Sequence, residues 1–339
     1  MENTTLELLN STANVTNGVE TDPIKIAMKQ VTSVLLVAIL AIIMMSLGCT
    51  IEFDKLIKQI KRPLPALIGM ALQFIVYPLM VFGMAYAFHL SQYDALGMLL
   101  IGTCPGGSLS NLITFWCEGD VVLSVCMTSL STAAAAGMMP LNLFIYSRAF
   151  TTETLQVPYK EIIIGLVLIL VPVAIGMLIH WKLPRVSAVI IKIGGALGFI
   201  FILGVTAINF YLYPQMFDAD WKLWVTAVLL PIFGLIVGYL GSWASCLNHA
   251  QCRTVGIEVS SQNVALCMTL IYVSFKLEVA IKIVMFPLIF AVFNVLVLVL
   301  YAIICKFVFI VQRKTTVKES ESKTLQQFTT NSKESEDVI

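Results

Sequence analysis

The chain has 339 residues, of which 58% are hydrophobic and only 12% are charged. Soluble domains carry about 25% charged residues, so a soluble domain of this size is excluded. A net charge of +1 gives no basic footprint for nucleic acid. Long apolar runs fill the chain between two polar ends. This pattern predicts an all-α polytopic membrane protein that has the lipid bilayer as its surroundings and no nucleic-acid partner.

The two ends of the chain differ in composition from everything between them. Within the segment 1–28, the first 23 residues lack the basic and apolar regions of a cleaved signal peptide. Three Asn-x-Ser/Thr sequons, at Asn3, Asn10 and Asn14, predict that this segment is a glycosylated extracellular tail. Residues 312–339 are rich in Ser, Thr, Lys and Glu, which predicts a disordered cytosolic tail.

Residues 29–311 contain the apolar runs and are predicted to form a nine-helix transporter domain. A membrane helix needs about 20 residues, and nine runs approach this length. An odd number of spans places the two ends on opposite sides, and the basic loop 54–62 marks the cytosolic side by the positive-inside rule. We therefore predict a multi-pass plasma-membrane protein with an extracellular N-terminus and a cytosolic C-terminus. The predicted spans are residues 31–49, 64–88, 95–116, 121–146, 162–179, 188–211, 223–245, 255–275 and 279–308.

Two of these spans contain segments that a continuous membrane helix would not tolerate. In span 95–116, Pro105 removes a backbone donor and is followed by two glycines that lower helix propensity. In span 255–275, Glu258 is the one carboxylate well inside any predicted span, where an unpaired polar group costs several kcal/mol. The alternatives are an ordinary kink in the first case and a loop residue near the cytosolic face in the second.

Taken together, the two segments predict a pair of discontinuous helices. Such pairs are typical of transporters built of inverted repeats, in which unwound carbonyls coordinate a cation and half-helix N-termini face an anion. Ser124 and Thr128 are four residues apart and share a helix face. They supply neutral oxygens, the ligands that hard cations such as sodium prefer. The alternative for this pair is hydrogen bonding to carbonyls of its own helix.

Several strings occur in the order found in one family of transporters. The strings are Ser46-Leu47-Gly48-Cys49, Lys61-Arg62-Pro63, Cys104-Pro105-Gly106-Gly107, Gly137-Met138-Met139-Pro140, Cys252-Arg253-Thr254-Val255 and Phe286-Pro287-Leu288. With these strings, from about residue 30 to about residue 310, the chain resembles the bile acid:sodium symporter family. The resemblance, which is nearest to the ileal and sulfated-steroid carriers, implies a core domain with two crossed discontinuous helices and a panel domain that lines the substrate path.

The resemblance further implies two sites for co-transported sodium ions and a set of positions that face the substrate. The first sodium site would use Ser110, Asn111, Ser124, Thr128 and Glu258. The second would use Gln73, Glu258, Gln262 and backbone carbonyls near Val259 and Ser261. Asn263 and Asn294 would face the substrate, although for Asn294 an inter-helix hydrogen bond is an equal alternative.

One departure from the family pattern concerns the second break. Relatives that carry bile acids usually have Glu-Thr-Gly before the x-Gln-Asn, whereas this chain has Glu258-Val259-Ser260. Without the glycine, a break that needs a positive φ would be costlier. The residues implied for the two sodium sites are kept, so this departure bears on the identity of the substrate.

The resemblance thus implies sodium-coupled symport of an amphipathic organic anion, either a bile acid or a sulfated steroid, into the cell. Two sodium ions per substrate would make the cycle electrogenic. A second copy of the chain, in a homodimer, is a further candidate partner. No His-Glu-x-x-His motif is present, and an enzyme is not expected. The alternatives are a non-transporting receptor or sensor of steroid-like ligands and a proton-coupled organic-anion carrier.

Overall fold

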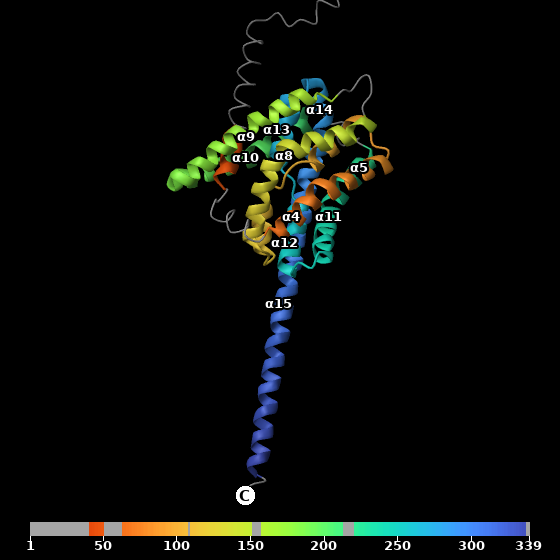
Figure 1. The fold of residues 1–339 in the computed structure, drawn as a ribbon. Coiled ribbons are helices and arrows are strands. Elements are labelled where there is room, and N and C mark those ends of the chain that lie inside the picture. Colours follow the sequence, from red (N-terminus) through yellow and green to blue (C-terminus); the bar gives the residue numbers. More distant parts are fainter. Residues whose placement is uncertain (1–40, 51–62, 108, 151–156, 213–219, 337–339) are drawn as a thin grey trace, which may run out of the picture.

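A computed structural model describes residues 41–50, 63–107, 109–150, 157–212 and 220–336 (Figure 1). Every secondary-structure element within these ranges is a helix, and the predicted all-α class is confirmed. The sequons at Asn3, Asn10 and Asn14 and the basic loop 54–62 lie outside the described residues.

The elements follow the predicted apolar runs closely. Residues 41–49 are helical and belong to the first predicted span. The second span is interrupted by a π-helical turn, which the sequence did not predict. In chain order the elements are α4 (Leu64–Ala71), the π-helix η1 (Leu72–Val76), α5 (Tyr77–Ala87), α6 (Gln92–Gly102), α7 (Leu109–Trp116), α8 (Val121–Tyr146), the 3-10 helix η2 (Ser147–Ala149), α9 (Tyr159–Lys182), α10 (Pro184–Leu212), α11 (Trp221–Ala244), α12 (His249–Ser260), α13 (Val264–Ser274), α14 (Leu277–Ile283) and α15 (Met285–Glu336).

Five helical segments of the described chain are long and apolar enough to cross a membrane. Two further predicted spans are divided, into α6 and α7 with 11 and 8 residues and into α12 and α13 with 12 and 11 residues. At 1.5 Å per residue, none of these four halves spans a bilayer alone. The five long segments are Leu64–Ala87, Val121–Ala149, Tyr159–Lys182, Trp221–Ala244 and Val279–Gln312.

Helix α15 is longer than the sequence predicted. It continues to Glu336, through most of the segment 312–339 that was expected to be disordered, and projects from the helical body in Figure 1. No glycine or proline follows Pro287 in the sequence. Extending an existing helix adds one hydrogen bond per residue without a new nucleation cost. The polar segment therefore continues the helix that its apolar neighbour begins.

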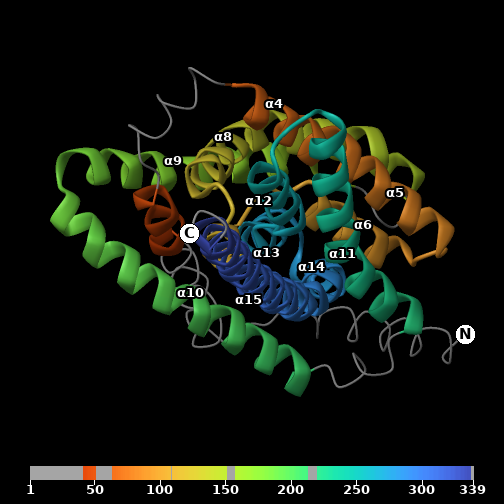
Figure 2. The ribbon, with the colours of Figure 1, turned by 90° about the horizontal axis from the view of Figure 1, so that it is seen from below.

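The broken helices α12 and α13 lie in the middle of the protein in the view from below (Figure 2). Helix α12 contacts α11, α7, α8 and α4. Helix α10 lies at the edge of this view and packs on α9.

Residues 41–49 and α9 approach each other backbone to backbone. A Cβ atom on Gly48 would overlap the carbonyl of Val173, and one on Gly176 would overlap the carbonyl of Met45. Close contacts of this kind between small residues hold membrane helices together through van der Waals packing. The helix at 41–49 therefore packs directly against α9.

Candidate functional site

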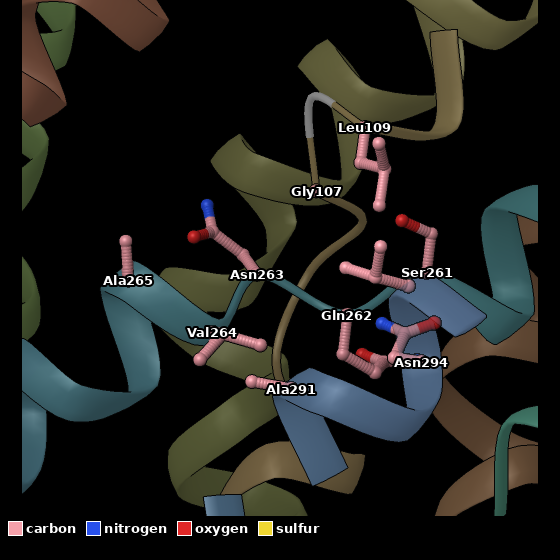
Figure 3. Close-up of a pocket in the computed structure, with 10 residues that line it drawn as sticks. Gly107, Leu109, Ser261, Gln262, Asn263, Val264, Ala265, Ala291 and Asn294 are labelled. Carbon is pink, nitrogen blue, oxygen red and sulfur yellow. The ribbon is translucent and has the colours of Figure 1, made fainter. Parts of the chain in front are cut away.

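The two breaks meet and satisfy each other's backbone. The amide of Gly107 donates to the carbonyl of Ser261 at 2.8 Å, and the amide of Asn263 donates to the carbonyl of Pro105 at 3.0 Å. Between them, Gly106 and Gln262 form an antiparallel β-bridge, and Figure 3 shows the two segments crossing. Unwound backbone inside a membrane protein needs such partners, because no water supplies them.

The second break unwinds without a left-handed residue. Ser261 has φ −87° and ψ 94°, and Asn263 has φ −78° and ψ 85°. Ser260 still belongs to α12, and its hydroxyl donates to the carbonyl of Pro231 on α11 at 2.7 Å. The expectation that the missing glycine makes this break costlier is therefore wrong. The break is extended, a conformation open to any residue.

The residues predicted for the first sodium site converge on one carboxylate. Glu258 is fully buried on α12, and its Oε1 lies 2.6 Å from the hydroxyl of Thr128. Its Oε2 lies 3.3 Å from the hydroxyl of Ser124, which also donates to Oδ1 of Asn111 at 2.8 Å. The hydroxyl of Ser110 lies 3.4 Å from that of Thr128. Five side chains from α7, α8 and α12 thus surround one small volume.

Gly106 and Ser131, which the sequence analysis gave no role, also belong to this cluster. A Cβ atom on Gly106 would overlap Oε1 of Glu258, so glycine allows the first break to approach the carboxylate. The amide of Gly106 in turn donates to the hydroxyl of Ser131 at 3.2 Å. Ser131 follows Ser124 and Thr128 at the spacing i, i+4, i+7, which is one face of a helix. This spacing was a signal that the sequence did contain.

The residues predicted for the second sodium site also lie together. Gln73 is buried on η1, and its Nε2 donates to the carbonyl of Cys104 at 3.0 Å and to Oε1 of Gln262 at 3.1 Å. Nε2 of Gln262 donates to the carbonyl of Val259 at 2.7 Å, and the Ser261 carbonyl belongs to the bridge described above. Oε1 of Gln73 is buried and has no hydrogen-bond partner within the described chain. It is therefore an acceptor free to bind a cation.

Glu258 has only neutral hydrogen-bond partners among the described residues. They include the hydroxyls of Ser124 and Thr128, which belong to the first set. A buried carboxylate without a balancing charge is strongly disfavoured. The arrangement therefore calls for a bound cation or a proton. Neutral oxygens around a single carboxylate suit a hard cation, and the described ranges contain no group of three or more His, Cys, Asp or Glu side chains that could hold a metal ion.

A cavity of about 170 Å³ lies beside the crossing, and both predicted substrate-facing residues line it (Figure 3). Oδ1 of Asn263 accepts from the amide of Leu266 at 3.0 Å and so caps α13. Oδ1 of Asn294 has no partner in the described part of the chain, which does not support the alternative of an inter-helix bond through this atom. The hydroxyl of Ser261, which also lines the cavity, is equally unpartnered.

Comparison with known proteins identifies the family. The profile of the Sodium Bile acid symporter family matches residues 37–217. The chain belongs to this family. Symporters are membrane transporters, so this is a family of transporters and not of enzymes. The long apolar helices of the described chain agree with a multi-pass membrane protein.

Named relatives align with most of the chain. The mouse sodium-dependent organic anion transporter is 36% identical over 292 residues, which are 85% of this chain and 78% of that protein. The human ileal sodium/bile acid cotransporter is 38% identical over 265 residues, which are 78% of this chain and 76% of that protein. Both aligned regions are long enough to include most of the helices described above.

Proposed function

We propose that this protein is a plasma-membrane symporter that couples sodium entry to the uptake of amphipathic organic anions, either bile acids or sulfated steroids. The observation that carries the proposal is the convergence of neutral oxygens on the buried, uncompensated carboxylate of Glu258, next to a cavity. The names of the relatives, a sodium-dependent organic anion transporter and a sodium/bile acid cotransporter, support the same coupling ion and substrate class.

Two sodium ions fit the oxygens that the site offers. The first ion would be held by Ser110, Asn111, Ser124, Thr128 and Glu258. The second would be held by Gln73, Glu258, Gln262 and the carbonyls of Val259 and Ser261. The free Oε1 of Gln73 supports the second site, and a carbonyl that accepts one hydrogen bond keeps a second lone pair for a cation. Glu258, by balancing part of the charge of both ions, would couple the two sites.

The substrate would bind with one of its substituents in the cavity beside the crossing. A volume of about 170 Å³ is well below the roughly 300–1,000 Å³ of a site for a whole drug-sized ligand. Figure 3 places Ser261 and Asn294 on one side of the segment through Gly107, and Asn263 on the other. The unpartnered oxygens of Ser261 and Asn294 are then met by polar groups of the bound substrate.

The described helices support the division into two domains that the family resemblance implies. Residues 41–49, α9 and α10 would form the panel domain, and the crossed helices with α4, α8, α11 and α15 would form the core. Nine spans, an extracellular N-terminus and a cytosolic C-terminus complete the proposed topology. The homodimer stays a prediction.

Uptake of radiolabelled taurocholate and estrone sulfate by cells that express the chain tests the proposal. Uptake of at least one compound should require sodium and disappear when choline replaces it. Uptake driven by an acid outside pH without sodium would instead support proton coupling. Saturable binding of either compound without accumulation would support the receptor alternative, and both results would contradict sodium symport.

A further inference from the structure

The π-helical turn η1 (Leu72–Val76) lies directly before a proline. In a regular α-helix the carbonyl of Phe74 would accept from the amide of residue 78. That residue is Pro78, which has no N–H. The carbonyl of Phe74 is consequently left without its usual donor inside the protein, where an unsatisfied backbone group is costly.

A side chain from another helix supplies the missing donor. Nδ2 of Asn142, on α8, donates to the carbonyl of Phe74 at 2.9 Å, and both residues are buried. Phe74 directly follows Gln73 in the same turn. A change of the backbone at Phe74 would therefore also move the neighbouring residue Gln73.

We propose that Asn142 is a positioning residue for the second sodium site. By holding the π-helical turn against α8, it keeps the Gln73 amide oriented toward Cys104 and Gln262, with Oε1 free for the ion. This inference rests on the proposed sodium symport. It adds a residue that does not touch the ion and that lies outside both predicted ligand sets.

The same helix serves both sodium sites in this arrangement. Helix α8 provides Ser124 and Thr128 to the first site and Asn142 to the turn that carries the second. A displacement of α8 that accompanies binding at the first site would therefore also act on Gln73. Asn142 gives the two sites a structural connection in addition to the shared charge of Glu258.

Replacement of Asn142 by leucine, which has a similar volume and no donor, tests the assignment. One hydrogen bond of ordinary strength corresponds to about a 3- to 10-fold change in affinity. We expect Asn142→Leu to raise the sodium concentration for half-maximal uptake by about this factor. The maximal rate at saturating sodium, and the substrate KM measured there, should change less than about twofold.

Two double variants separate positioning from a general structural effect. In a Gln73→Ala background, Asn142→Leu should add no further shift, because the residue it positions is gone. In a Pro78→Ala background, the restored amide can satisfy Phe74, and Asn142→Leu should have little effect. The matched control is Thr226→Val, which removes a buried hydroxyl that donates to its own helix at Lys222, 2.7 Å away. It should leave the sodium dependence unchanged.

Thermal unfolding of the purified variants with and without sodium gives a readout that does not depend on transport. Weaker sodium stabilisation of Asn142→Leu, which Pro78→Ala restores, supports the assignment. An unchanged sodium dependence, or an equal shift in the Gln73→Ala background, overturns it. If Pro78→Ala fails to rescue an unstable Asn142→Leu protein, the role is structural and the proposal is wrong. Absence of sodium-dependent uptake by the unaltered protein would instead contradict the proposed function itself.

Discussion

At the scale of single residues, the proposed binding of sodium depends on Glu258. Its two oxygens face two hydroxyls of α8, and the break that carries Gly106 is close enough to exclude any side chain at that position. Hydroxyls can stabilise a carboxylate through hydrogen bonds but bring no charge of their own. The charge of Glu258 is therefore available to the ions.

Replacement of Glu258 by glutamine keeps the shape of the side chain and removes its charge. We expect normal surface delivery and a loss of uptake of about 100-fold or more at any sodium concentration, because the loss of one partner from a buried ion pair costs about 3–5 kcal/mol. Uptake over a range of sodium concentrations measures this. Glu161→Gln, at an exposed carboxylate in the first turn of α9, is the control. Near-normal transport by Glu258→Gln would rule out the shared carboxylate.

Some of the residues predicted as sodium ligands stand out in the sequence because they carry polar groups where apolar ones are expected, whereas Gln73 was implied only by the family resemblance. Ser110, Asn111 and Gln262 stand out in this way beside a proline or a buried acid. Asn142 could not be assigned, since its role depends on which face of α8 meets a turn almost 70 residues earlier in the chain. Long-range packing of this kind leaves no local signal.

At the scale of elements, the two breaks have different origins. The first follows from Pro105 and its glycines, and the sequence predicted it directly. The second has no proline or glycine within Ser261–Asn263, and it is held open by hydrogen bonds to the first. The hydroxyl of Ser260 adds a hydrogen bond from α12 to the carbonyl of Pro231 on α11. The sequence indicated this break only through its polar residues, and the turn η1 was not predicted.

Restoring the family glycine at this position tests whether the break needs it. We expect Ser260→Gly to lower the free energy of unfolding by about 1 kcal/mol, because it removes a hydrogen bond and adds backbone entropy to the unfolded chain. A lower midpoint of thermal unfolding in detergent would show this, with Ser245→Gly, at an exposed position after α11, as the comparison. A rise in stability would mean that serine strains the backbone here.

At the scale of the whole molecule, the proposed stoichiometry has an electrical consequence. Two sodium ions and one monovalent anion carry a net charge of +1 in each cycle, since Glu258 stays with the protein. The movement of this charge inward releases about 2.3 kcal/mol per 100 mV of membrane potential. Uptake should therefore depend on voltage as well as on the sodium gradient.

Recording under voltage clamp measures this current. A sulfated or carboxylated steroid should evoke an inward current that is proportional to uptake and absent in choline, whereas an uncharged sterol should evoke none. Sodium-dependent flux without a matching current would indicate one sodium ion per monovalent anion. In that case the second site would not be used, while the family and fold would be unaffected.

The bridge between the two breaks also affects the conformational entropy that is lost when an ion binds. The carbonyl of Ser261 and the backbone beside Glu258 are fixed by hydrogen bonds at Gly107 and Asn263. A flexible loop would lose conformational entropy of about 1–2 kcal/mol for each residue ordered around a ligand. Here that entropy is lost when the chain folds and not when the ion arrives, so a cage of mostly neutral oxygens can bind sodium without first having to assemble.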